Sequence, residues 1–277
     1  MRILLLLLLE TTVFIAGCAT VPRRDAIPLA SFEQAPAPTL PPSRLLALTR
    51  VKNPAVKPLK FSPEQQQLIR NSLVPGDVLL TYTAGVSSNL VVPGRFKHCI
   101  VFVGTAAERS SLESFRSGEV TIDDSSGDII EARVEGVMLN RIADAMNTRV
   151  SRMVVLRPRL SHQDRQAYVS EVLSYRGQKY DFAMDFRDPS RKVCTEVVYW
   201  ALQGRCSIDF RLTNRAGRPM LLSDDIAATH LQHSTPTSGF ACVLFADEDP
   251  DQSQHARISL NREAEEQLRL FMRWRSS

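Results

Sequence analysis

The chain has 277 residues, of which 44% are hydrophobic and 23% are charged, and its formal net charge is +4. These values are ordinary for a soluble globular protein. The arginines are scattered, with no run of basic residues and no interleaved aromatics, so the sequence predicts no nucleic-acid partner. Five cysteines are too few for a disulfide scaffold.

The N-terminus is typical of a secretory signal peptide. Arg2 precedes an apolar run from Ile3 to Leu9, which is too short to span a bilayer. The segment Ile15-Ala16-Gly17-Cys18 resembles a bacterial lipobox, which implies a signal peptide over residues 1–17 and acylation of Cys18. Ala19 follows, and by resemblance to other lipoproteins this implies a periplasm-facing anchor in the outer membrane of a Gram-negative bacterium. An ordinary cleaved signal with an incidental cysteine is the alternative.

Residues 18–60 form the next region, which contains half of the chain's 16 prolines. Proline lacks a backbone donor and favours extended conformations, so we expect a semi-rigid tether that holds the following domain away from the membrane.

Residues 61–277 predict one α+β domain, a mainly antiparallel sheet with packed helices. Ser62 and Gln65 form a capping box, and Ser161 with Asp164 has the same spacing. Residues 106–126 are polar and are expected to be an irregular surface insertion. The expected strands are 77–82, 96–104, 128–132, 136–139, 153–156 and 240–245, and the expected helices are 63–73, 162–175, 191–204 and 261–273.

Cys194 is the first candidate for chemistry. With Ser190 as the N-cap, it falls in the first turn of a helix, where unpaired N–H groups and the helix dipole favour a thiolate. Arg187, Arg191 and Lys192 add positive potential nearby. The alternative is a buried structural cysteine, since a free cysteine packs as a small hydrophobe.

His98 and Glu131 are the second and third candidates. His98 lies in an apolar strand, where its imidazole needs a partner. The adjacent Cys99 points to the opposite face of that strand. Glu131 follows Ile129-Ile130 and would bring a carboxylate to the sheet interior, where it could orient His98 as in a cysteine–histidine–acid triad. A satisfied core histidine and a solvated strand-end charge are the alternatives.

The other histidines suggest no metal site. Their spacing matches no known ligand pattern, and no Cys-x-x-Cys motif occurs, so we expect neither a metal nor a cofactor. Cys206 and Cys242 could form a disulfide, which the sequence leaves open.

Six segments in order carry a resemblance to a known family. They are Pro75–Leu80, His98–Gly104, Ile130–Ala132 with Gly136-Val137, Tyr180-Asp181, Cys194–Val198 and Met220–Asp225. In these segments the chain resembles the permuted papain-fold branch of the NlpC-type superfamily, the YiiX/YebB-like proteins.

This resemblance implies a circularly permuted papain-like fold in which the histidine strand precedes the cysteine helix. It also implies Cys194 as nucleophile, His98 as general base and Glu131 as the residue that orients it. The activity implied is a cysteine hydrolase, a peptidase or amidase acting on peptidoglycan peptides. A lipid acyltransferase or thioesterase acting on acyl-lipids is the alternative within the fold, and a non-catalytic envelope-binding lipoprotein is the third possibility.

Overall fold

The computed structural model describes residues 57–83, 94–112, 127–215 and 217–273. The predicted signal peptide, Cys18 and most of the predicted tether lie outside the described residues. No helix among those described is long and apolar enough to cross a membrane.

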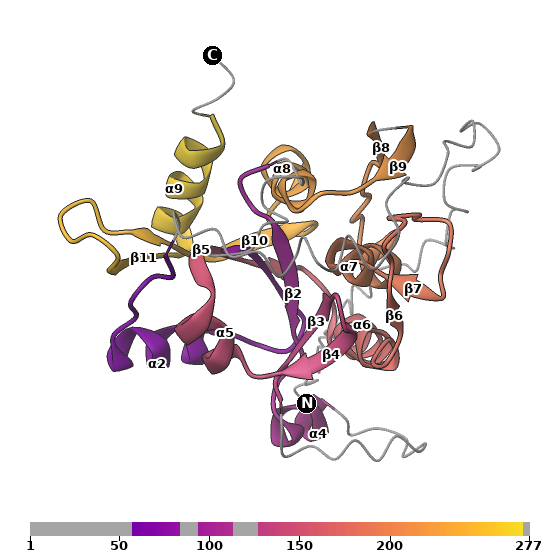
Figure 1. Ribbon diagram of the computed structural model, residues 1–277, viewed down its shortest axis with the longest axis horizontal. Helices are drawn as coiled ribbons and strands as arrows, with labels where there is room; N and C mark the ends of the chain where they lie inside the picture. The colour runs from indigo at the N-terminus through magenta and orange to yellow at the C-terminus, as the bar shows by residue number, and fades with distance from the viewer. Residues whose placement is uncertain (1–56, 84–93, 113–126, 216, 274–277) are drawn as a thin grey trace, which may run out of the picture.

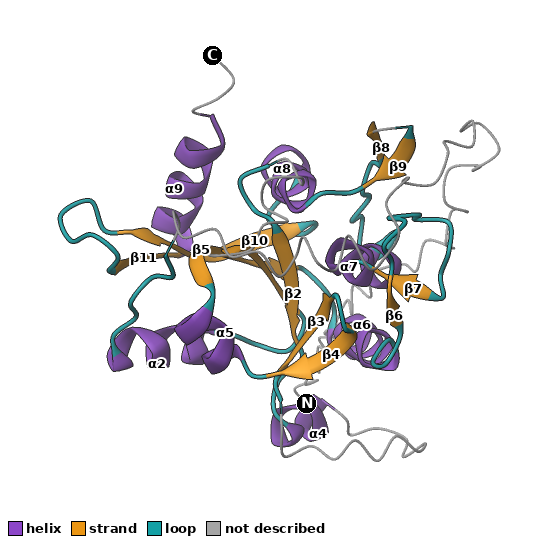
Figure 2. Cartoon of the chain, in the orientation of Figure 1, coloured by secondary structure: helices purple, strands orange, loops and turns teal. Residues whose placement is uncertain are grey.

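A sheet of seven strands forms the centre of the molecule, and every neighbouring pair in it is antiparallel (Figures 1 and 2). Its strand order is β11-β10-β5-β1-β2-β3-β4. The bounds are β1 Asp77–Thr83, β2 His98–Phe102, β3 Ile129–Arg133, β4 Gly136–Asn140, β5 Val150–Pro158, β10 Phe240–Glu248 and β11 Ala256–Leu260.

Helices cover both faces of this sheet (Figure 2). On one face, α2 and α5 pack over Leu79, Ile100 and Val155; on the other, α6, α7, α8 and α9 pack over Val78 and Val101. Neighbouring residues such as Val78 and Leu79 lie on opposite faces because side chains alternate along a strand with a period of two residues. The helix bounds are α2 Pro63–Ser72, α4 Ala106–Leu112, α5 Ile142–Thr148, α6 His162–Ser174, α7 Cys194–Leu202, α8 Ser223–His233 and α9 Asn261–Arg273.

Two small sheets border the cysteine helix. β6 (Lys179–Tyr180) and β7 (Arg191–Lys192) pair in parallel, and β8 (Thr213–Arg215) pairs with β9 (Arg218–Met220) in antiparallel fashion. In Figure 1 both lie on the α7 side of the molecule.

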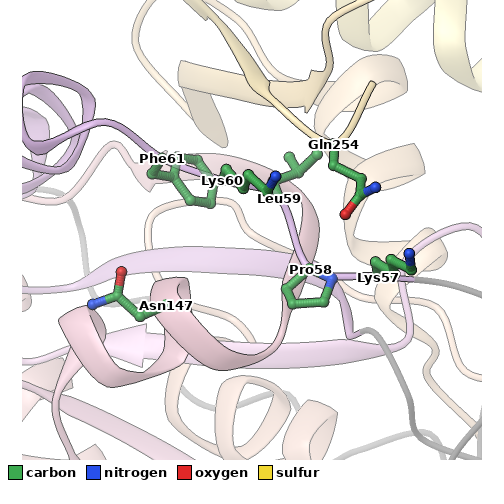
Figure 3. A pocket seen from close by; sticks show the side chains of 7 residues that line it. All are labelled: Lys57, Pro58, Leu59, Lys60, Phe61, Asn147 and Gln254. Atoms are coloured by element: carbon green, nitrogen blue, oxygen red, sulfur yellow. The ribbon is translucent and has the colours of Figure 1, made fainter. Parts of the chain in front are cut away.

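The chain enters the domain beside β11. Leu59 N donates to Val150 O at 2.8 Å, and Ala256 N donates to Lys60 O at 3.1 Å. A cavity of about 400 Å³ lies under this entry, between Pro58, Asn147 and Gln254 (Figure 3). The last residues of the predicted tether, Leu59 and Lys60, are therefore fastened to the sheet by their backbone and belong to the folded domain.

The α+β layout and the main elements follow the sequence-based expectation. Both serine caps are confirmed: Ser62 forms a full capping box, and Ser161 accepts from Asp164 N. The expectation of an irregular segment is wrong for residues 106–112, which form α4. There the Glu108 carboxylate accepts from Thr105 N, and the Thr105 hydroxyl accepts from Glu108 N. This reciprocal pair is the capping box of a helix start.

The possible disulfide between Cys206 and Cys242 does not form. No disulfide involves Cys99, Cys194, Cys206 or Cys242. The sulfur of Cys206 contacts Asp164 Oδ2 at 3.4 Å instead.

Candidate active site

The first turn of α7 brings Cys194 to a place where β2 and β3 separate. β2 pairs with β3 only over Ile100 to Phe102, so its first two residues lack a partner on that side. Along a strand, the N–H groups of every second residue point to the same side. The N–H group of Val103 points toward β3, where it donates to Asp128 O. The N–H group of Cys99 therefore points into the opening, where it donates to the Cys194 sulfur.

Helix α7 begins at Cys194, and its N-cap is Val193 rather than the expected Ser190. Ser190 instead donates from both its N–H and its hydroxyl to Asp188 Oδ1, which closes a turn before the helix. The shift leaves Cys194 in the first turn, as expected. There the N–H group of Thr195 also donates to the sulfur.

His98 contacts Cys194 and Glu131 at once. Its side chain is 15% exposed, and its Nε2 lies 2.7 Å from Glu131 Oε2. A hydrogen bond also joins the imidazole to the Cys194 thiol, and Nδ1 is the ring nitrogen left for it. The register explains the Glu131 contact, because Glu131 pairs with Ile100, and His98 is its diagonal neighbour on the same face.

Glu131 is fully buried and its charge is compensated by three residues. Arg149 donates to both carboxylate oxygens, at 3.1 and 2.8 Å, and Asn140 Nδ2 donates to Oε1 at 2.7 Å. Burial raises the pKa of Glu131, but the bonds to His98 and Arg149 outweigh that cost and hold the pKa far below its usual value. Glu131 is therefore an anion that fixes the far side of the imidazole.

These contacts favour a thiolate–imidazolium pair. Burial raises the pKa of the Cys194 thiol, but His98 and the N–H groups of Cys99 and Thr195 outweigh it, so this pKa lies below its ordinary value. Burial also lowers the pKa of His98, yet its bonds to Cys194 and Glu131 raise it to about 9. At neutral pH the imidazole therefore holds its proton, and the thiolate of Cys194 is favoured over that of an ordinary thiol.

The expected help from nearby basic side chains is weaker than predicted. Arg187 pairs with Asp185 at 2.6 Å, and the exposed Arg191 lies 3.9 Å from Asp188. The activation of the thiol therefore depends mainly on His98 and on backbone N–H groups.

Glu196 lies in the first turn of α7, two residues after Cys194, without repelling the thiolate. Its Oε2 accepts from Val193 N at 2.7 Å, which caps the helix. Burial raises the pKa of Glu196 to about 8, against the lowering effect of that hydrogen bond. The carboxyl group is thus mostly protonated and uncharged at neutral pH.

Asp224, at the start of α8, holds the segment that leads into His98. Its two oxygens accept from Arg95 N and Phe96 N, each at 2.8 Å. Gly94 lets the loop wrap around this carboxylate, because its φ is +112° and a Cβ there would meet the Asp224 side chain at 3.0 Å. Asp224 is thus a positioning residue for the histidine strand.

The structure brings the three predicted residues together: Cys194, His98 and Glu131 form one hydrogen-bonded chain. Sequence reasoning missed Arg149, Asn140 and Asp224. Asn140 could have been found from the hairpin register, since Glu131 pairs with Met138 and Asn140 is the next residue on that face. Asp224 lies in the Met220–Asp225 segment of the family resemblance, but no role was predicted for it, and Arg149 comes from another element and has no local signal.

A second group of side chains with metal-ligand chemistry lies outside this site. His230, Cys242 and Glu265 bring three ligand atoms within 4.8 Å of one another. Their separation in sequence hides the group from any search by spacing.

We predict that Cys194 reacts with iodoacetamide faster than the other described thiols, and at lower pH than an ordinary thiol of pKa about 8.5. His98→Ala removes the imidazolium and leaves burial to raise the pKa of Cys194, so alkylation at neutral pH should slow about tenfold for each unit of increase. The rate is measured by mass spectrometry from pH 5 to 10 on peptides containing each cysteine.

Cys99 and Cys206 are internal controls, because both are buried and neither is in a disulfide. Glu131→Gln keeps the shape of the side chain but removes its charge, so it should slow Cys194 less than His98→Ala does. Equal rates for Cys194 in the wild-type and His98→Ala proteins would contradict the proposed ion pair.

We predict that Asp224→Asn raises the pH midpoint of Cys194 alkylation. The amide offers one acceptor in place of two, so the 94–96 loop loses a hydrogen bond and His98 is held less firmly against the thiol. Asp225→Asn is the matched control: Asp225 caps its own helix through Leu222 N and pairs with Arg215. A midpoint that moves equally in both variants would point to general loosening of α8.

A match to a known protein family agrees with this geometry. The family described as permuted papain-like amidase enzyme, YaeF/YiiX, C92 family, matches residues 72–248. No curated protein matches the chain. A solved structure, that of metalloprotein YiiX from Escherichia coli O157:H7, is 14% identical, with 69% of this chain and 98% of that chain covered and a TM-score of 0.29.

The matched residues span more than half of the chain and include all three members of the hydrogen-bonded site. The α+β fold, with its histidine strand before its cysteine helix, is the permuted papain-like arrangement. The chain belongs to the C92 family of permuted papain-like amidases.

Proposed function

We propose that the protein is a membrane-anchored cysteine amidohydrolase that cuts amide bonds in cell-wall peptides. Cys194 is the nucleophile, His98 the proton carrier and Glu131 the residue that orients it. The observation that supports these roles most directly is the continuous chain of hydrogen bonds from the Cys194 thiol through His98 to the buried Glu131.

In the first half of the reaction, the Cys194 thiolate attacks the carbonyl carbon of the substrate. The carbonyl oxygen takes the negative charge, and the N–H group of Cys194 is suited to meet it, because the first N–H groups of a helix lack intrahelical acceptors. His98 then gives its proton to the departing amine as the C–N bond breaks. A thioester on Cys194 remains.

In the second half, the neutral His98 takes a proton from a water molecule that attacks the thioester. The carboxylic acid leaves, the sulfur becomes a thiolate again, and the imidazole holds the proton taken from water. Glu131 stays ionised throughout and keeps Nε2 of His98 engaged, so Nδ1 stays directed at the sulfur. Activity should therefore fall at high pH as His98 loses its proton near pH 9.

The proposed location rests on the N-terminal sequence. The apolar run and the Ile15-Ala16-Gly17-Cys18 segment favour export and acylation at Cys18, with an outer-membrane anchor that faces the periplasm. The proline-rich stretch that follows would let the domain reach peptidoglycan, which favours a cell-wall peptide over other amides.

We predict that globomycin, which blocks processing of lipoprotein signals, leaves an uncleaved precursor of this protein. Cys18→Ala should also prevent maturation and acylation, whereas Cys194→Ala should mature normally. Processing is followed by immunoblot and by mass analysis of the N-terminal peptide. A soluble mature form cut elsewhere, with unchanged processing of Cys18→Ala, would rule out the lipid anchor.

We predict that the purified protein releases new amino and carboxyl ends from sacculi, and that Cys194→Ser abolishes this while keeping the fold. Losing a nucleophile or its base commonly costs several orders of magnitude in rate. Products are identified by mass spectrometry, with a phospholipid substrate in parallel. Deacylation of the lipid with sacculi untouched would show the acyltransferase or thioesterase activity instead; no turnover of either substrate, with slow alkylation of Cys194, would support a non-catalytic scaffold.

A further inference from the structure

We propose that His230, Cys242 and Glu265 form a binding site for a divalent zinc ion that fastens helix α9 to helix α8 and strand β10. The three residues come one each from α8, β10 and α9. Their ligand atoms, a ring nitrogen, a sulfur and a carboxylate oxygen, all lie within 4.8 Å of one another. No member of the site belongs to the proposed catalytic group.

Cys242 lies on the face of β10 that α8 and α9 cover, which it shares with Phe240 two residues before it. The register of β10 against β5 shifts after Cys242, so Val243 is an extra residue in the strand. Because of this β-bulge, Val243 and Leu244 both pack on the opposite face, and Phe245 returns to the face of Cys242. The Cys242 sulfur therefore lies close to the ligand atoms of His230 and Glu265.

The imidazole of His230 is oriented with Nε2 toward the other two ligands. Its Nδ1 lies 3.3 Å from Ser234 Oγ, and the Phe240 carbonyl accepts a hydrogen bond from the ring. Gly239 permits this close approach, since a Cβ there would meet Ser234 Oγ at 2.5 Å. Histidines that bind metals commonly donate their other ring N–H to such a carbonyl, which fixes the tautomer.

Glu265 is arranged to offer one oxygen. Arg269 holds its Oε1 at 2.6 Å, and its Oε2 lies 2.5 Å from His230 Nε2. A cation bound between these atoms would take the place of the proton in the Nε2–Oε2 hydrogen bond and of the thiol proton, so binding releases both.

The donor set selects the class of metal. Imidazole nitrogen, thiolate sulfur and carboxylate oxygen together suit zinc, whereas magnesium and calcium prefer oxygen ligands alone. His230 and Cys242 are buried, with 4% and 8% of their surface exposed, while the Glu265 side chain is 25% exposed. The ion would therefore enter from the Glu265 side, and water would complete its coordination.

The test uses the full-length chain in a Cys18→Ala, Cys194→Ala background, which removes the thiols most able to bind metal elsewhere. Zinc content is measured by elemental analysis after dialysis against zinc, and affinity by competition with a chelating dye. Cobalt(II) then reports a bound thiolate through its sulfur-to-metal absorption band. We expect one zinc per chain, the thiolate band with cobalt, and a rise in the thermal unfolding midpoint with zinc.

Two conservative variants separate a metal site from a merely structural cluster. Cys242→Ser should abolish the cobalt–thiolate band, and both it and Glu265→Gln should weaken zinc binding by at least about a hundredfold, since loss of an outer-shell partner alone costs 10–100-fold. Cys206→Ala is the matched control, because Cys206 is as buried as Cys242 and should leave binding unchanged. A background protein that binds no zinc at micromolar concentrations, or folded variants that bind it as tightly as the background, would overturn the proposal.

Discussion

The buried charge of Glu131 is the constraint on which the site depends. An ionised carboxylate inside a sheet is costly unless every lone pair that faces the protein finds a donor. Here the donors come from β2, from the end of β4 and from the residue after α5: His98, Asn140 and Arg149. Satisfying this one group therefore fixes the relative positions of three separate elements. Because one of the donors is His98, the same constraint selects the orientation of the imidazole and keeps it protonated.

A second constraint acts on the thiol, which meets His98 at the edge of the sheet and not across one of its faces. His98 lies on the face covered by α2 and α5, whereas α7 packs on the other face. Cys194 and His98 can make contact because β3 stops pairing with β2 beyond Glu131. The first turn of α7 lies beside the edge of β2 that β3 leaves unpaired. The N–H group of Cys99 would otherwise lack a strand partner, and the Cys194 sulfur accepts from it. One hydrogen bond thus gives the backbone N–H group of Cys99 an acceptor and also stabilises the thiolate of Cys194.

The sequence predicted those features whose signals are local. The caps at Ser62 and Ser161 depend on residues three positions apart, and each gave the right helix start. The N-cap expected at Ser190 was wrong because a turn closed by Asp188 uses that serine first. Contacts between residues far apart in the sequence could not be predicted in this way. Arg149 contacts Glu131 only because α5 packs against the sheet. Prediction from sequence therefore named the three central residues, through their order and their neighbours, but not the groups that compensate their charges.

Helix α8 shows how one short motif can serve two purposes. Successive helix residues point about 100° apart, so the two aspartates at its start face different surroundings. Asp225 accepts from Leu222 N and completes the helix's own first turn, while Asp224 accepts from the loop before His98. The carboxylate of Asp224 also neutralises part of the dipole at the helix start, so it has a reason to stay ionised although burial raises its pKa. The position of His98 relative to Cys194 therefore depends partly on α8, although no atom of α8 belongs to the hydrogen-bonded chain of Cys194, His98 and Glu131.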